Sequence, residues 1–187
     1  MVRIFVLKSN TACLDNINPK SPASSGRFDV VLDFVLECLF DRYGPRHDVV
    51  VYTVLDGCSP CRILKFDISN VPRRRIDSES EVLKLIFEKS VQVLDMNFRQ
   101  FLEMLKRDGV KLVCLFEEGD PVDKHLRDIC SGDVAFIIGD QDGFTQSDLS
   151  VMREVGCRFV SIGPIPYLSW FCCVYVNYLL DTYCAST

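Results

Sequence analysis

Two stretches of this chain decide its fold: Phe136-Ile137-Ile138-Gly139-Asp140-Gln141-Asp142-Gly143-Phe144-Thr145 and Ser161-Ile162-Gly163-Pro164-Ile165-Pro166-Tyr167-Leu168. Each runs from an apolar, strand-like segment to a glycine and then into a helical pattern. A glycine at the end of a strand lets a ligand approach the backbone closely. A single loop of this kind is more often a plain tight turn. Two of them in neighbouring strand–helix units, beside a third, acidic loop at residues 117–121, favour a cofactor pocket.

The rest of the chain repeats this alternation of apolar runs and helical patterns. Strands are predicted at residues 3–7, 49–55, 111–116, 134–139 and 157–162, with an edge strand or hairpin arm at 62–67. Helices are predicted at residues 27–43, 78–94, 97–107, 122–129, 145–155 and 167–183. The alternation indicates one α/β domain over residues 1–187, a mostly parallel sheet with helices on both faces. Ligands of such sheets bind beyond the carboxyl ends of the strands, where the three loops lie.

The chain is acidic, with a formal net charge of −5, although 48% of its residues are hydrophobic. This balance is typical of a folded soluble protein and excludes a basic coat that binds nucleic acid without specificity. An RNA site would then be a local basic patch. The best candidate is the run Arg73-Arg74-Arg75 together with Arg46 and Arg62. A charge run is usually only a solvated face, but this one gains weight because the rest of the chain is acidic.

The most apolar segment, residues 159–180, is interrupted by Gly163, Pro164 and Pro166. The uninterrupted part is shorter than the about 20 residues that a membrane-spanning helix needs. The first residues also lack the pattern of a secretion signal. We therefore expect a soluble intracellular protein with no membrane partner.

Other common sites find no support in the sequence. The glycine-rich motifs of dinucleotide and triphosphate sites are absent, and neither histidine lies near a nucleophile. Cys58 and Cys61 form a lone C-x-x-C pair, and a zinc site would need two more ligands from a chain whose histidines are His47 and His125. No metal site is predicted. We expect Cys58 and Cys61 to be a loop thiol pair or a disulfide, and most of the ten cysteines to be buried thiols.

The two loop stretches resemble the SPOUT superfamily of knotted methyltransferases and, within it, the archaeal TrmY family of tRNA (pseudouridine-54, N1) methyltransferases. The likeness rests on Gly139-Asp140 with Gly143-Phe144-Thr145, on Ser161-Ile162-Gly163-Pro164, and on Cys172 in the last helix. It continues in Gly26-Arg27-Phe28-Asp29 and Arg46-His47-Asp48 and is weakest at residues 70–97. The last helix departs from the family, because Ser169-Trp170-Phe171-Cys172 stands where the family carries Ala-Ser-His-Cys.

The resemblance implies properties that patterning alone does not predict. It implies a C-terminal trefoil knot in residues 111–187, an RNA-facing part in residues 1–110, and an obligate homodimer. One apolar face of the helices at residues 27–43 and 167–183 could close on the partner, although both helices could instead be sandwiched inside one subunit. The implied activity is methyl transfer from S-adenosylmethionine to N1 of pseudouridine 54 in the TΨC loop of tRNA, in the cytoplasm.

The same resemblance suggests roles for individual residues. Cofactor binding is expected from Leu115, Phe116, Ile138, Gly139, Asp140, Gly143, Ser161, Ile162, Gly163, Ile165, Leu168 and Cys172. Glu117 and Asp142, with Asp140, could balance the charge of the sulfonium. Asp29 would accept the imide proton or orient the base, and Arg27 would hold a phosphate or developing negative charge. Without the resemblance, Asp29 is simply an acid favoured by the helix dipole, and Cys172 a packing residue.

Three other functions stay open. The first is a ribosomal-RNA pseudouridine N1-methyltransferase, which differs only in the RNA that takes up the methyl group. The second is a non-catalytic nucleotide- or RNA-binding α/β module, which would not bind S-adenosylhomocysteine as a folded dimer. The third is a redox protein that uses Cys58 and Cys61.

Overall fold

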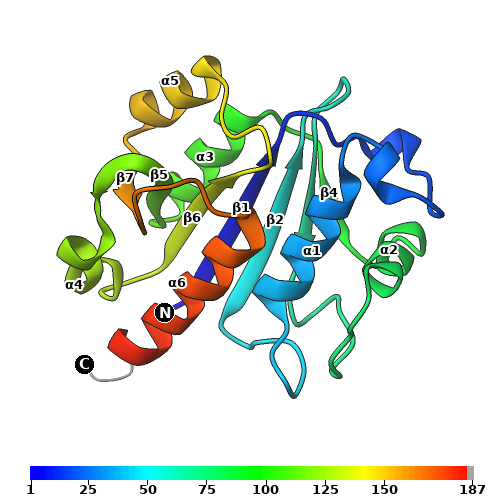
Figure 1. The fold of residues 1–187 in the computed structure, drawn as a ribbon, viewed down its shortest axis with the longest axis horizontal. Coiled ribbons are helices and arrows are strands. Elements are labelled where there is room, and N and C mark those ends of the chain that lie inside the picture. Colours follow the sequence, from blue (N-terminus) through cyan, green and yellow to red (C-terminus); the bar gives the residue numbers. More distant parts are fainter. Residues whose placement is uncertain (185–187) are drawn as a thin grey trace.

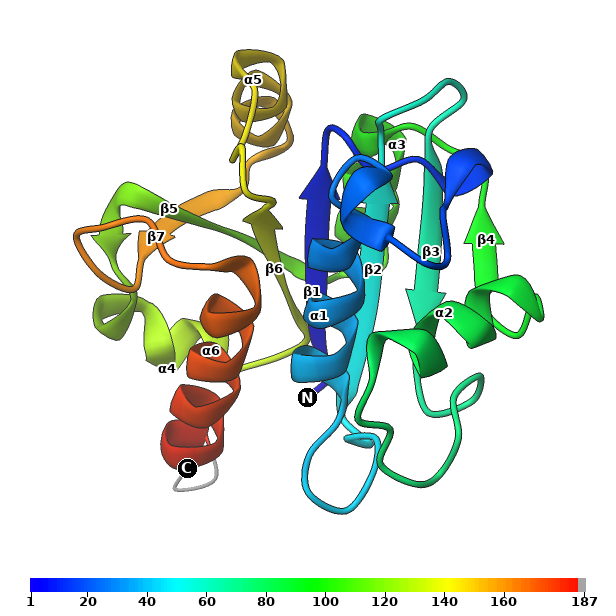
Figure 2. The same ribbon diagram turned by 45° about the vertical axis from the view of Figure 1, so that its right-hand side comes forward.

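The computed structural model describes residues 1–184 and contains one seven-stranded sheet. The strands are β1 (Arg3–Ser9), β2 (Val49–Leu55), β3 (Arg62–Phe66), β4 (Gln92–Leu94), β5 (Lys111–Pro121), β6 (Val134–Gly139) and β7 (Arg158–Ser161). They lie in the order β4-β3-β2-β1-β6-β5-β7 (Figure 2). Five strands, β2, β1, β6, β5 and β7, pair with one another in parallel. Strands β3 and β4 are antiparallel to their neighbours. The predicted α/β class and mostly parallel sheet are confirmed.

Helices cover both faces of this sheet (Figure 1). The longer helices are α1 (Phe28–Leu39), α2 (Glu79–Phe87), α3 (Phe98–Arg107), α5 (Gln146–Val155) and α6 (Ser169–Tyr183), with a short α4 (Leu126–Ile129). Single turns of 3₁₀ helix occur at Leu14–Asn16, Pro22–Ser24 and Val122–His125. Helices α1, α2, α4 and α6 pack on the face that carries Phe5 and Phe136. Helices α3 and α5 pack on the opposite face, around Val6 and Phe101.

Alternation along β1 explains the two layers. Phe5 and Leu7 point into the first core, Ile4 and Val6 into the second, and all seven residues of the strand are buried. A strand buried on both faces carries an almost continuous apolar run, which is what the sequence shows here. No helix within residues 1–184 combines the length and apolar character that a bilayer crossing requires.

Two predictions about secondary structure are wrong. Residues 117–121, expected as a loop, continue strand β5 to Pro121 and pair with β7. The expected helix at residues 78–94 ends at Phe87, and Gln92–Leu94 instead forms strand β4. Of the two alternatives for residues 62–67, the hairpin arm is confirmed: β3 pairs antiparallel with β2, and it is not an edge strand because β4 pairs with its other side. Ser78, the residue before α2, makes no side-chain cap hydrogen bond. A capping box does form at Asn97, whose side chain accepts from the backbone N–H of Gln100.

The cysteines also differ from the expectation. Three disulfides join Cys13 to Cys58, Cys38 to Cys173, and Cys130 to Cys184. Cys58 is therefore not paired with Cys61, which stays a free thiol, and six of the ten cysteines are bridged rather than free. The sequence could not reveal these partners, because each bridge joins residues at least 45 positions apart.

Candidate functional site

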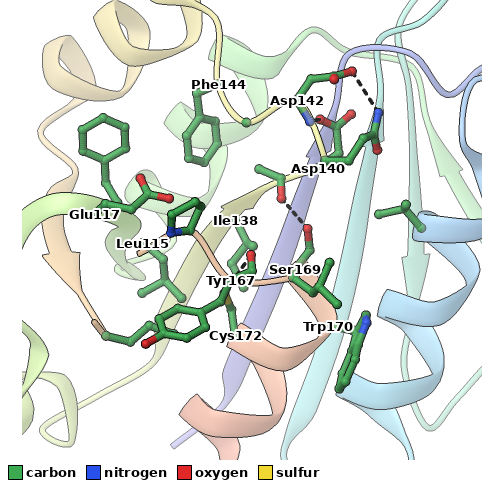
Figure 3. A pocket seen from close by; sticks show the side chains of 18 of the residues that line it. Leu115, Glu117, Ile138, Asp140, Asp142, Phe144, Tyr167, Ser169, Trp170 and Cys172 are labelled. Atoms are coloured by element: carbon green, nitrogen blue, oxygen red, sulfur yellow. Dashed lines mark hydrogen bonds between the residues drawn. The ribbon is translucent and has the colours of Figure 1, made fainter. Parts of the chain in front are cut away.

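A cavity of about 690 Å³ lies where the middle of β5 and the carboxyl ends of β6 and β7 meet the first turns of α1 and α6. This volume suits a cofactor-sized ligand. Figure 3 shows side chains from these elements, including Leu115, Ile138 and Cys172, turned toward one space. Both glycine loops singled out from the sequence contribute to the wall, whereas the third stretch, residues 117–121, continues strand β5 and contributes only Glu117.

The residues expected to bind the cofactor all line this cavity. They are Leu115, Phe116, Ile138, Gly139, Asp140, Gly143, Ser161, Ile162, Gly163, Ile165, Leu168 and Cys172. Arg27 and Asp29, proposed for the substrate side, line it as well, and so do Glu117 and Asp142. The fold therefore brings together residues from four separate parts of the sequence.

The Gly139–Thr145 loop is a tight turn with an ordered interior. Asp140 is buried at 7% exposure, and its carboxylate accepts from the backbone N–H groups of Asn10 (3.0 Å) and Asp142 (3.0 Å). These bonds make Asp140 a residue that shapes the loop, whereas Asp142 and Glu117 are exposed in the wall. Gly143 has φ +71°, which favours glycine, and a Cβ at Gly139 would lie only 2.8 Å from the Gly143 Cα.

The second loop turns back on itself before α6. The Ser161 hydroxyl donates to the carbonyl of Gly163 at 2.6 Å and accepts from its N–H at 3.1 Å. The Tyr167 ring packs on Gly163 so closely that a Cβ there would lie 2.5 Å from the hydroxyl oxygen. Ser169 then donates to the Gly139 carbonyl at 2.6 Å (Figure 3), which joins the two loops directly.

The entrance to α1 carries the charged pair. Arg27 adopts a left-handed backbone conformation (φ 58°) as the residue before the helix. Its guanidinium donates to both carboxylate oxygens of Asp29, and this bonding raises the pKa of Arg27. Asp33, one turn further on, also lines the cavity, and burial next to Asp29 raises the pKa of its carboxyl.

Cys172 contributes an uncharged wall. Burial raises the pKa of its thiol to about 11, so it stays protonated at neutral pH and is not a nucleophile there. The walls formed by Leu115 and Ile138 are buried, whereas Ile165 and Leu168 are more than half exposed at the rim. The cavity thus offers apolar surfaces, backbone groups at glycines, and carboxylates, a set that fits an adenosine with a positively charged sulfur.

The five arginines of the expected RNA patch do not gather at this cavity. Arg73, Arg74 and Arg75 lie between β3 and α2, against Gly44, at the far end of α1 from the cavity. Arg46 is held by Asp181 (2.5 Å), and Arg62 pairs with Asp95 across the strand ends (2.9 Å). Arg74 pairs with Glu81, and Arg75 with Asp77. Among residues 1–184, Arg73 has no ion pair.

Sequence reasoning missed several residues of the site. Asp33 and Trp170 line the cavity but sit inside helical patterns that look like ordinary packing faces. Asn10 contacts the Gly139–Thr145 loop from behind, through Asp140 and Gly143. The sequence offered one sign that this end of the strand is special: Lys8 is a charged residue at the end of an otherwise apolar run.

Comparison with known proteins agrees with this geometry. Residues 2–185 match a family model described as "Putative SAM-dependent RNA methyltransferase". The chain is 29% identical over 174 residues to a tRNA (pseudouridine(54)-N(1))-methyltransferase of Methanococcoides burtonii, covering 86% of this chain and 85% of that protein. It is 29% identical over 202 residues to a protein of the same name from Thermococcus onnurineus, covering 97% and 98%.

The fold is similar to a solved structure as well. Archaeoglobus fulgidus Nep1 bound to S-adenosylhomocysteine superposes with a TM-score of 0.67 at 18% identity, over 100% of this chain and 99% of that chain. At this level of identity the likeness concerns the fold. The relatives confirm the resemblance that the two loop stretches indicated.

Proposed function

The chain belongs to the family of SAM-dependent RNA methyltransferases that its residues 2–185 match, and from this we propose that it methylates N1 of pseudouridine 54 in the TΨC loop of tRNA. Its relatives carry the name of that activity. The observation that carries the proposal is the convergence of the two glycine loops, strand β5 and the Arg27–Asp29 pair on one cavity.

Residues of the two glycine loops and of strand β5 would hold S-adenosylmethionine, which supplies an electrophilic methyl group on a sulfonium. Leu115, Ile138 and Leu168 would contact its adenine and ribose, and backbone groups at Gly139 and Gly163 would bind their polar edges. Glu117 and Asp142 are exposed in the wall, where their carboxylates would balance the positive sulfur.

The acceptor side is formed by the start of α1. Methylation of a ring nitrogen requires that its proton leave and that the nitrogen line up with the methyl group. Asp29 accepts this proton or orients the base, and Arg27 stabilises negative charge that develops on the base. Because Arg27 binds both oxygens of Asp29, the carboxylate keeps a fixed direction toward the cavity.

We include a trefoil knot in this proposal, with residues 111–187 as the knotted cofactor-binding part and residues 1–110 as the part that faces RNA. Strand β7 lies at the edge beyond β5, yet α6 packs against α1 on the other side of β6. The segment between β7 and α6 must therefore cross back over the ends of β5 and β6 (Figure 2). This return path supports a threaded C-terminus.

We also propose that the enzyme is a homodimer that works in the cytoplasm, where tRNA is its substrate. One stripe of α6 supports the dimer: Phe171, Val174 and Tyr178 recur at helical spacing and are exposed, and Tyr167, just before the helix, is exposed as well. Helix α1 contributes less, because most of its apolar side chains are buried within the subunit between the sheet, α2 and α6. For α1, the sandwiched alternative fits better.

The test is mass spectrometry of nucleosides from tRNA that carries pseudouridine 54, after incubation with the protein and S-adenosylmethionine. The expected product is N1-methylpseudouridine, absent when position 54 is uridine. Methylation of ribosomal RNA instead of tRNA would support the ribosomal alternative. Failure of the folded protein to bind S-adenosylhomocysteine would support the non-catalytic module. The redox alternative requires Cys58 and Cys61 as a pair, and Cys58 is bonded to Cys13 instead.

A further inference from the structure

One ammonium group is completely buried behind the candidate cofactor loop. Lys8 stands near the carboxyl end of β1 with 0% of its surface exposed. By strand alternation it points to the same side as Val6, toward α3 and α5, and away from α1 and α6. A buried charge is costly unless it is paired and hydrogen-bonded.

Three oxygen atoms meet this ammonium. Nζ donates to the side-chain oxygen of Asn10, lies 2.9 Å from an oxygen of Asp56, and lies 3.4 Å from an oxygen of Asp148. The ring of Phe98 is 5.6 Å away and adds a cation–π contact. Two of the three N–H donors of the ammonium thus make hydrogen bonds, to Asn10 and Asp56, and Asp148 adds an ion pair.

Two of these partners hold the loop that lines the cavity. Asn10 donates its backbone N–H to Asp140 at 3.0 Å and its side-chain amide to the carbonyl of Gly143 at 3.3 Å. Asp148 accepts from the backbone N–H of Thr145 at 2.9 Å and from its hydroxyl at 2.7 Å. The loop is thus fixed at its beginning and at its end by two residues, Asn10 and Asp148, whose side chains share one ammonium.

We propose that Lys8 is a positioning residue for cofactor binding, which acts through Asn10 and Asp148 on the shape of the Asp140–Thr145 loop. Lys8 itself is not among the residues that line the cavity. The inference rests on the proposed function, because it assigns the loop to S-adenosylmethionine. Since the loop would bind the cofactor and Asp29 would serve the acceptor, loss of Lys8 should weaken cofactor binding and leave the rate at saturation almost unchanged.

The experiment uses Lys8→Met in the full chain. Titration calorimetry measures the dissociation constant of S-adenosylhomocysteine, and tRNA methylation gives KM for S-adenosylmethionine and kcat. We expect the dissociation constant and KM to rise about tenfold or more, since displacement of a binding group by ~1 Å can have effects of this size. kcat at saturating cofactor should stay within about twofold of the wild-type value.

Arg3→Met is the matched control. Arg3 is a buried cation on the same strand, and it pairs with Asp48 (3.1 Å) and Asp181 (2.5 Å) at the opposite end of β1. It should lower the thermal unfolding midpoint as Lys8→Met does, but leave the dissociation constant unchanged. Equal cofactor affinity in wild type and Lys8→Met would overturn the inference, and so would an equal loss of affinity in both variants.

A milder variant covers the case in which Lys8→Met does not fold. Asn10→Ala removes the link between Lys8 and Gly143 but keeps the backbone N–H that reaches Asp140. It should raise the dissociation constant several-fold, and an unchanged value would overturn the inference. The wild-type protein separates the two proposals: if it does not methylate tRNA, the proposed function fails, whereas an active wild type with unaffected variants refutes only the role of Lys8.

Discussion

At the cavity wall the guanidinium of Arg27 donates two hydrogen bonds to the carboxylate of Asp29, with Nε 3.0 Å from Oδ1 and Nη2 3.0 Å from Oδ2. Two parallel bonds fix the direction of a carboxylate as well as its position. The pair stands on the first turn of α1, where the positive end of the helix dipole also favours an acid. Asp29 is therefore the first residue to substitute in a test of the proposed methyl transfer.

Asp29→Asn is expected to lower the methylation rate while cofactor binding persists. The amide has nearly the same shape as the carboxylate but cannot accept the imide proton, and a general base contributes about 10²–10⁴-fold to a rate. Single-turnover methylation of tRNA measures the rate, and calorimetry with S-adenosylhomocysteine measures binding. Full activity in the variant would show that another group takes the proton.

Arg73→Ala is expected to weaken tRNA binding at low salt. Arg73 is exposed and has no ion pair in the described part of the chain, so its charge is free to meet a phosphate. Loss of one phosphate contact should reduce the slope of log affinity against log salt by about 1. Filter binding over a salt series measures this slope. Arg107→Ala, an equal charge change at the exposed end of α3, should leave it unaltered.

Tyr178→Asp is expected to yield monomers. Tyr178 is 67% exposed within one subunit, in the apolar stripe of α6 assigned to the partner. A carboxylate buried in that contact would lack a partner and oppose association. Light scattering after size-exclusion chromatography gives the mass of the particle, with Tyr43→Asp as the control at an exposed tyrosine away from α6. Monomeric wild-type protein would remove the dimer proposal.

Asp33→Asn is expected to stabilise the fold at pH 7. Burial, and then the charge of Asp29, raise the pKa of Asp33 above its usual 3.8, so the native state holds this proton more tightly than the unfolded state does. Stability therefore falls as the pH rises from 3.8 through the raised pKa, and above it the charged form is a constant cost. Burial, and then the charge of Asp33, likewise raise the pKa of Glu79.

Thermal unfolding at several pH values tests this prediction. Asparagine has no carboxylate, so the unfolding midpoint of the variant should exceed that of the wild type at pH 7. The difference should shrink as the pH is lowered toward 3.8. A difference that is the same at every pH would mean that the charge of Asp33 is not its origin.

Thiol titration in denaturant should distinguish free from bridged cysteines. The free thiols are Cys61, Cys114, Cys157 and Cys172, so the unreduced protein should show four reactive groups and the reduced protein all ten. Ten reactive groups before reduction would mean that the bridges do not form under those conditions. Peptide mapping of the unreduced protein would then identify each pair, with Cys13–Cys58 as the bridge that replaces the expected C-x-x-C pair.

Patterns with a local cause could be predicted from the sequence. The apolar run of β1 and the glycines at strand ends each reflect forces within a few residues. Because carboxyl ends of parallel strands meet at one edge, the two glycine loops could also be expected to converge. The resemblance to a family then supplied Arg27 and Asp29.

Features that depend on distant partners could not be predicted. The strand at Gln92–Leu94 forms only because β3 offers it an unpaired edge, and its three residues carry too little pattern to be recognised alone. The partner of Cys58 is Cys13, 45 residues away, and the C-x-x-C spacing pointed elsewhere. The role of Lys8 depends on Asn10, Asp56 and Asp148, which come from three separate segments.

The Cys38–Cys173 bridge has a mechanical consequence for turnover. It joins α1, which begins directly after Arg27 and carries Asp29 in its first turn, to α6, whose first turn carries Ser169 and Cys172. The methyl donor and the methyl acceptor would thus be held by two helices that a covalent bond prevents from separating. Entry of fresh cofactor and escape of the spent one must then depend on movement of the connecting loops, with the helix pair as a rigid frame.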